Sequence, residues 1–142
     1  MSADRYPFSW PVRVYWEDTD AGGVVYHAAY VQFLERARTE WLRSAGIEQG
    51  RWRQEMDRVF AIRSMEVDFR APARLDDALV VDVGLSQVRG ASIGFVQRIR
   101  RPADETLLIE ARVKAVCLRA SDFRPVPIPA QFAALLRVHC PA

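Results

Sequence analysis

The stretch from Tyr15 to Tyr30 holds the residues whose types and spacing are best suited to chemistry. It contains three acids, two glycines and the first of only two histidines, namely Glu17, Asp18, Asp20, Gly22, Gly23 and His27. A carboxylate in such a loop can attack a carbonyl carbon or remove a proton from water. The paired glycines let the backbone turn tightly and approach a ligand closely. A helix that starts after the loop presents unpaired N–H groups and a partial positive charge, which polarise a carbonyl.

The residues alone leave the working acid open. Asp18 and Asp20 are two positions apart, so in an extended segment their side chains share a face, while Glu17 faces the other way. An acidic turn before a helix, with His27 as a cap or a hydrogen-bonded core residue, explains the same pattern without catalysis. Spacing by itself therefore does not decide between a structural and a catalytic loop.

A strand before this loop and a long helix after it are predicted to hold it in place. Alternation at Val12, Val14 and Trp16 predicts a half-buried strand directly before the loop. From about Ala28, apolar residues recur every three or four positions, which predicts an amphipathic helix that ends near Gly46. The stripe consists of Tyr30, Phe33, Leu34, Ala37 and Trp41.

The rest of the chain reads mainly as strands. A short helix is expected around residues 48–55, followed by four strands arranged as a meander, and then a small helix at 129–138. The expected strands are 59–69, 79–87, 92–101 and 106–118. The last alternates Leu108, Glu110, Arg112 and Lys114 with Ile109, Ala111, Val113 and Ala115. The terminal helix should have as its apolar side Phe132, Leu135 and Leu136.

Strands joined by short turns imply an antiparallel sheet, and one long helix across it gives an α+β domain. The 142 residues form a single domain in this scheme, with a core at about 10–129. One helix cannot cover both faces and the edges of five strands, so self-association is expected, most simply as a two-fold dimer.

Composition excludes several classes of protein. Half of the residues are hydrophobic and 27% are charged, which excludes a disordered chain. No apolar run approaches about 18 residues and the start lacks a secretory pattern, so a cytoplasmic protein is expected. The net charge of +2 is dispersed, without the basic patch of a nucleic-acid binder. Two cysteines are too few for a disulfide framework, and the adjacent His139 and Cys140 make a poor metal site, so no metal is expected.

Several separated segments resemble one family. The quoted stretches are Glu17-Asp18-Thr19-Asp20-Ala21-Gly22-Gly23-Val24-Val25-Tyr26-His27, Glu35-Arg36-Ala37-Arg38, residues 71–77 and residues 95–99. They resemble the Tol–Pal-associated acyl-CoA thioesterases (the YbgC family), within the 4-hydroxybenzoyl-CoA-thioesterase-like hotdog superfamily. The resemblance covers about residues 10–129. It implies a hotdog fold, in which a sheet wraps around one long helix and pairs into dimers or tetramers.

Carried over by position, the resemblance makes Asp20 the catalytic carboxylate, acting as nucleophile or as general base. It makes the backbone N–H of His27 the oxyanion donor, and the imidazole of His27 an aid to substrate binding or water placement. Other hotdog thioesterases take their acid from the middle of the helix, which makes Glu35 the alternative. A local ion pair with Arg38 explains Glu35 without catalysis.

The resemblance also implies the residues that bind substrate. Those expected around the acyl group and its thioester are Gly22, Gly23, Val25, Tyr26 and Tyr30. Arg89 and Ser92 lie in a turn where related thioesterases contact the nucleotide end of coenzyme A, although an ordinary hairpin with a solvated arginine is equally consistent with that sequence. The expected phosphate contacts therefore depend on the resemblance and not on the turn itself.

The function implied is hydrolysis of acyl-CoA to a free acid and coenzyme A. No metal or redox cofactor is expected, because a thioester is already activated and water is the co-substrate. Two alternatives remain at this point. One is a thioesterase for acyl groups on acyl carrier protein, and the other is a non-catalytic scaffold that binds acyl-CoA or acyl carrier protein in phospholipid or envelope metabolism.

Overall fold

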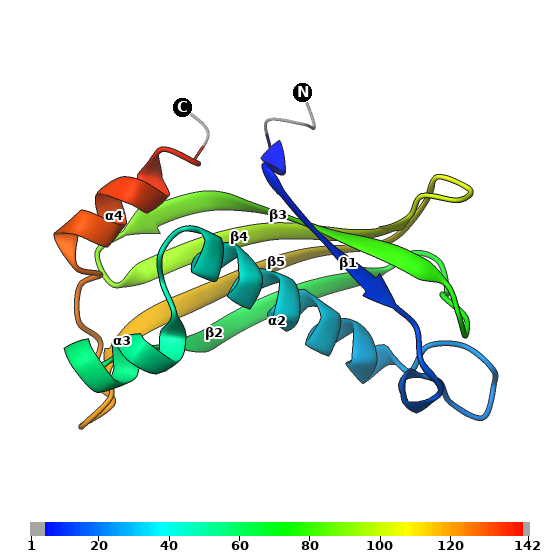
Figure 1. Ribbon diagram of the computed structural model, residues 1–142, viewed down its shortest axis with the longest axis horizontal. Coiled ribbons are helices and arrows are strands. Elements are labelled where there is room, and N and C mark those ends of the chain that lie inside the picture. The colour runs from blue at the N-terminus through cyan, green and yellow to red at the C-terminus, as the bar shows by residue number, and fades with distance from the viewer. Residues whose placement is uncertain (1–4, 141–142) are drawn as a thin grey trace.

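The computed structural model describes residues 5–140, and its main feature is a five-stranded antiparallel sheet with the helix α2 (His27–Ser44) across one face (Figure 1). The strands are β1 (Phe8–Arg13), β2 (Arg58–Phe69), β3 (Ala78–Arg89), β4 (Ser92–Arg101) and β5 (Thr106–Arg119). The shorter helices are η1 (Trp16–Asp18), α3 (Gln49–Met56) and α4 (Ala130–Arg137). Strands β2 to β5 begin and end within two residues of the predicted ranges.

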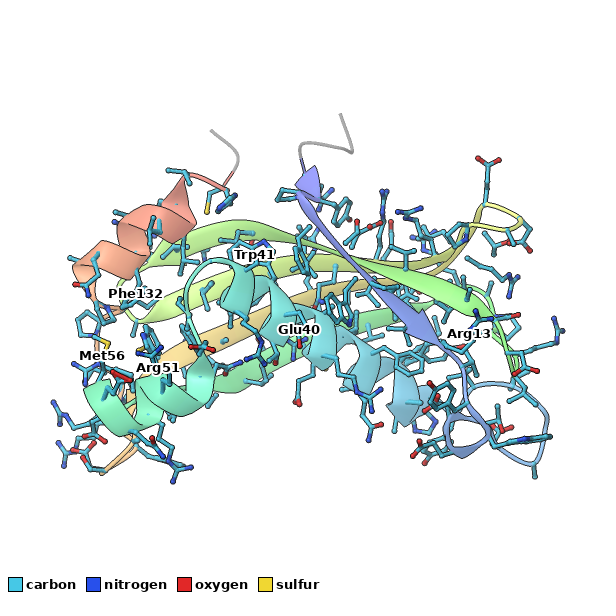
Figure 2. The ribbon with its side chains drawn as sticks, in the orientation of Figure 1. Arg13, Glu40, Trp41, Arg51, Met56 and Phe132 are labelled. Atoms are coloured by element: carbon cyan, nitrogen blue, oxygen red, sulfur yellow. The ribbon has the colours of Figure 1, made fainter. Side chains whose placement is uncertain are left out.

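The amphipathic pattern of α2 explains how the helix lies on the sheet. Two neighbouring residues show its two sides (Figure 2): Trp41 is 3% exposed and packs edge-on against Phe95 of β4, whereas Glu40 pairs with Arg43 near the surface. Gly46 follows the helix with φ at +94°, a conformation that glycine adopts without strain. The predicted helix and its stop are confirmed.

The alternation predicted for β5 is confirmed from Ile109 onward, whereas Leu108, expected on the polar face, is fully buried. Its buried side carries Ile109, Ala111, Val113 and Ala115, and Val113 pairs with Phe95, the residue on which Trp41 packs. Arg112 and Lys114 on the other face are exposed. The helix therefore packs on the apolar face of the sheet, and the outer face carries charge.

Two local predictions are wrong. The first strand ends at Arg13 rather than continuing to Trp16, which is 78% exposed in η1. The cause is Asp18, whose carboxylate accepts the Tyr15 N–H at 2.8 Å and curls the chain into a turn. Leu135 of α4 was expected on the apolar side but is 52% exposed. Ala133 takes the buried position instead, beside Leu136.

The predicted meander is only partly correct. The sheet order is β1-β3-β4-β5-β2, so β2 pairs with β5 rather than with its successor β3. The β3–β4 and β4–β5 turns are short and join neighbours, but the connection over residues 70–77 is long enough to pass the ends of two strands. Strand spacing of about 4.8 Å makes that crossing short. The sequence pattern gives strand identity but not pairing partners.

Strand β2 leaves one edge of the sheet open, since it pairs only with β5 among the described residues. Its side chains on the α2 face are apolar, and Ile62 and Phe69 are 47% and 51% exposed. The backbone of helix α2 lies nearest to β1 and β3, and its side chains also contact Phe95 of β4 and Phe69 of β2. Within residues 5–140, no helix is both long enough and apolar enough to cross a membrane.

Candidate active site

The loop between η1 and α2 is closed by its own backbone. The Asp20 N–H donates to the Val24 carbonyl at 2.9 Å, and the Gly23 N–H donates to the Asp20 carbonyl at 3.0 Å. Gly23 has φ at +79°, which side chains rarely adopt, so glycine is needed at this position. The turn thus holds Asp20 at a fixed place ahead of the helix.

Asp20 is exposed and half of its carboxylate is free. Its Oδ1 accepts the Gly22 N–H at 2.8 Å, whereas Oδ2 receives no hydrogen bond from residues 5–140. A Cβ at Gly22 would lie 3.2 Å from Oδ1, so the glycine permits this close approach. The carboxylate is therefore oriented by one oxygen while the other can accept a proton.

Asp18, the other aspartate of the turn, has a different environment. Its side chain is buried at 6% exposure, and its Oδ2 accepts the Tyr15 N–H. Its backbone carbonyl accepts the Tyr26 N–H at 2.8 Å. Both groups are used to hold the chain in the turn, so Asp18 connects η1 to the start of α2.

Helix α2 begins at His27 without a side-chain cap. The Ala29 N–H bonds to the Tyr26 carbonyl, but the N–H groups of His27 and Ala28 find no acceptor in the described chain. These free donors carry the positive end of the helix dipole. The Tyr26 ring stands against the His27 imidazole, with centroids 4.3 Å apart, and both residues are exposed.

A cavity of about 330 Å³ opens beside this helix start. Its lining consists of Val25, His27, Tyr30, Phe69, Arg70, Ala71 and Pro72. The remaining predicted residues of the loop lie outside that lining: Asp20, Gly22, Gly23 and Tyr26. Nothing in the sequence marked Phe69 as a site residue, and Ala71 and Pro72 were marked only as part of segment 71–77, which resembles the family.

The segment after β2 is tied to the helix start by hydrogen bonds. The Val25 N–H donates to the Ala73 carbonyl at 2.9 Å, and the Ala73 N–H donates to the Tyr30 hydroxyl at 2.9 Å. Burial raises the pKa of the Tyr30 phenol, which is 4% exposed. Tertiary contacts thus join three parts of the chain around His27.

Arg89 and Ser92 lie far from this cavity in the same chain. They pair with each other where β3 ends and β4 begins. The twelve residues of β3 start at Ala78, at the end of the sheet where α2 begins, and span about 36 Å at about 3.3 Å per residue. Figure 1 shows the β3–β4 hairpin at the opposite end of the sheet from the start of α2. One chain does not bring these two residues to the cavity.

Glu35 lies on the exposed side of α2, eight residues and about 12 Å along the axis from His27. The expected ion pair with Arg38 is not formed. Arg38 is instead buried, and its Nη1 donates to Gln97 Oε1 at 2.9 Å. Desolvation lowers the pKa of Arg38 to about 10, opposed by the charge of Glu35. In the part of the chain described, no three His, Cys, Asp or Glu residues group in a way that could hold a metal ion.

The sequence and the fold match one class of proteins. Residues 14–136 match the model of the thioesterase-like superfamily. The crystal structure of a 1,4-dihydroxy-2-naphthoyl-CoA thioesterase from Synechocystis superposes with a TM-score of 0.84 at 25% identity, covering 92% of this chain and 95% of that one. The predictions of a hotdog fold and of a thioester hydrolase are confirmed by these matches.

Sequence relatives narrow the class. An acyl-CoA thioester hydrolase YbgC of Escherichia coli is 51% identical over 122 residues, covering 86% of this chain and 90% of the relative. An acyl-CoA thioesterase YbgC of Haemophilus influenzae is 46% identical over 122 residues, covering 86% and 88%. The chain therefore belongs to the YbgC acyl-CoA thioesterases.

Proposed function

We propose that this protein hydrolyses acyl-CoA to a free acid and coenzyme A, with Asp20 and the start of α2 as its catalytic groups. The relatives named as acyl-CoA thioesterases support the substrate class. The observation that carries the proposal is the unpaired N–H of His27 at a cavity, one short turn after a carboxylate with a free oxygen. A helix start and an acid are the two groups that a hydrolysis of this kind requires.

In the proposed reaction, the thioester carbonyl oxygen accepts a hydrogen bond from the His27 N–H. Asp20 takes a proton from water as the water oxygen adds to the carbonyl carbon, and the carbonyl electron pair moves onto the oxygen. When this pair returns, the C–S bond breaks and the coenzyme A thiolate leaves with the pair of that bond, and it then takes up the proton that Asp20 holds, which restores the carboxylate. A fixed donor aimed at such an oxyanion is worth about 2.7–4 kcal/mol.

Asp20 acts as a general base in this scheme, and direct attack by its carboxylate is the alternative. Attack would form a mixed anhydride that water then cleaves. A single turnover in ¹⁸O-labelled water separates the two routes. General-base catalysis leaves Asp20 unlabelled, whereas the anhydride route allows the label to enter its carboxylate.

The acyl group is proposed to occupy the cavity beside His27, against Val25 and Tyr30. Gly22 and Gly23 add no side chain to the loop and are proposed to let the thioester approach it, and the exposed Tyr26 is proposed to contact the acyl group from outside the cavity lining. The imidazole of His27 is held against Tyr26 and is proposed to help place the substrate or the attacking water.

A second copy of the chain is proposed to complete the site. The open edge of β2 and its exposed apolar side chains, Ile62 and Phe69, suit antiparallel pairing with the same edge of a partner. A two-fold axis through β2 reverses the partner, so the partner's β3–β4 hairpin would come to the end that holds Asp20. This arrangement gives Arg89 and Ser92 a route to the nucleotide end of a substrate bound across the interface.

The oligomer is tested by sedimentation of the wild type and of Ile62→Lys. The wild type is expected to be a dimer or a tetramer. The charge that Ile62→Lys places on the β2 edge should shift the variant toward the monomer and lower its activity in proportion. A wild type that remains monomeric at the assay concentration and is fully active would contradict a shared site.

The reaction is tested by thiol release from short, long, branched and aromatic acyl-CoAs. Asp20→Asn is expected to lower kcat by about 10³-fold or more, because Asn cannot accept the proton. Glu55→Gln removes a surface carboxylate that pairs with Arg51 on α3 and is the matched control, expected at the wild-type rate. Wild-type activity in Asp20→Asn would refute the assignment.

The group that carries the acyl chain in the substrate is identified by comparing the same acyl chain linked to coenzyme A and to acyl carrier protein. A higher kcat/KM with coenzyme A is expected, and a strong preference for the carrier protein would reassign the substrate. Binding of acyl-CoA without thiol release would replace the enzymatic proposal with a scaffold role. A cytoplasmic location and the absence of a cofactor stay predictions.

A further inference from the structure

The side chain of Tyr30 is held rigidly at the edge of the cavity. Its ring packs edge-on against Phe33 and Phe69, with centroid separations of 6.3 and 5.9 Å. Only 4% of the residue is exposed. Because the Tyr30 ring packs between the rings of Phe33 and Phe69, its hydroxyl occupies a defined position.

That hydroxyl lies at the level of the helix start. Long side chains on a helix lean toward its N-terminus, so Tyr30 reaches back past the first turn. The Ala73 N–H donates to Tyr30 Oη, and the carbonyl of the same Ala73 accepts from Val25, two residues before His27. His27 and Tyr30 are three residues apart on one face of α2, and both line the cavity.

The hydrogen of this hydroxyl has no acceptor. A phenol oxygen accepts and also donates, and Oη accepts from Ala73, yet no group among residues 5–140 receives its O–H. A buried donor left without a partner costs free energy, so an acceptor in the cavity would be favoured. The His27 N–H is a second donor at the same cavity that lacks an acceptor. One atom with several lone pairs would satisfy both.

We propose that the Tyr30 hydroxyl is a second donor to the thioester carbonyl oxygen, acting beside the backbone N–H of His27. This inference rests on the proposed function. As water adds to the carbonyl carbon, the oxygen gains negative charge and both hydrogen bonds strengthen. The bond that Ala73 donates into Oη polarises the phenol and makes its O–H a stronger donor.

The protonation state of Tyr30 suits this role. Burial raises the pKa of the phenol and outweighs the bond from Ala73 and the charge of Arg101, which lower it, while the charges of Asp77 and Asp20 act in the same direction as burial. The hydroxyl therefore keeps its proton at neutral pH. A phenol that lined the pocket only by its ring would need no hydroxyl there.

The test compares Tyr30→Phe with Tyr6→Phe, its matched control. Tyr6 lies on the outer face of the sheet over Arg98, so its variant also loses one phenol oxygen, but away from the cavity. Tyr30→Phe is expected to lower kcat by about 10²-fold, the usual effect of removing one oxyanion donor. KM and the affinity for an unreactive thioether analogue of the substrate should stay near wild type, as should the acid limb of the pH profile. Tyr6→Phe should match the wild type.

Other outcomes overturn the proposal. If Tyr30→Phe loses affinity for the analogue as much as it loses kcat, Tyr30 serves to hold residues 69–73 in place. If the acid limb of the pH profile shifts, the Tyr30 O–H acts on Asp20 and not on the substrate oxygen. If Tyr30→Phe does not fold, 3-fluorotyrosine incorporated at position 30 keeps both hydrogen bonds and lowers the phenol pKa. The basic limb of kcat should then move to lower pH, and an unmoved limb refutes the role.

The proposed function and this inference fail in different ways. A wild type without thiol release, or an active Asp20→Asn, removes the function itself. An active wild type with an inactive Asp20→Asn and a fully active Tyr30→Phe removes only the role of Tyr30.

Discussion

Two aspartates in different regions of the fold differ in how many hydrogen-bond donors their carboxylates accept. Asp82 of β3 lies on the outer face of the sheet, is 2% exposed, and accepts bonds from Ser9 Oγ at 2.6 Å, Arg98 Nε at 2.7 Å and Arg100 Nε at 2.8 Å. Asp20 lies in an exposed loop with one bond to a backbone N–H. A carboxylate saturated with donors is held in place, whereas one with a free oxygen can take a proton.

The supporting elements differ in the same way. Ser9, Asp82 and Arg98 sit at matched positions on β1, β3 and β4, so the strand ladder fixes their spacing. Desolvation acts to raise the pKa of Asp82, but the bonds from Arg100, Ser9 and Arg98 outweigh it and hold that pKa below its usual value. Asp20 depends only on a short turn, which leaves its second oxygen accessible.

Replacement of Asp82 should give the largest change in stability. Asp82→Asn removes the charge shared by two arginines, and we expect the free energy of unfolding to fall by about 2 kcal/mol, since bonds to charged groups contribute about 1.5–3 kcal/mol. Both arginines are partly exposed and can be hydrated, so the loss stays moderate. Urea unfolding measures it. Activity per folded molecule should be unchanged, the reverse of what is expected for Asp20→Asn. A loss of activity without a loss of stability would show that the role of Asp82 is not structural.

Acid should remove the contribution of Asp82 to stability. The pKa of Asp82 is lower in the folded than in the unfolded chain, so the stabilisation is complete above the unfolded value, about pH 4, and is lost as pH falls through the folded value. The stability difference between wild type and Asp82→Asn should therefore shrink when unfolding is measured at pH 3 instead of pH 7. A constant difference would show that the charge of Asp82 is not the cause.

The smallest effect is expected at Gly23 in the turn that holds Asp20. At φ +79°, an added Cβ meets nothing within 4 Å, so Gly23→Ala should cost only the backbone strain, about 1 kcal/mol. Gly50→Ala is the control, because that glycine is within α3 and its added Cβ is also free of contacts. It should stabilise by up to about 1 kcal/mol, since Ala favours a helix. Thermal unfolding measures both variants, and a change of stability in the same direction in both would contradict the argument.

Sequence patterns predicted those parts of the fold that depend on neighbours in the chain. The stripe on α2 and the alternation on β5 each describe which side of one element is apolar, and both are confirmed, that of β5 from Ile109 onward. The pattern at Trp16 misled because a single carboxylate, Asp18, bonded the backbone and ended the strand early. The position of β2 at the sheet edge was missed because hydrophobic alternation says nothing about which strands pair.

The chemistry of the candidate loop follows from its own residues: an acid in a glycine turn before a helix whose first N–H groups lack partners among the described residues. These features are local, because they depend on φ preferences and on bonds across a few residues. The residues that surround the loop come from distant parts of the chain. Ala73 meets Tyr30 across 43 positions of the chain, and residues 69–72 line the cavity from the end of another strand. Such contacts are set by strand order and packing, which no local pattern contains.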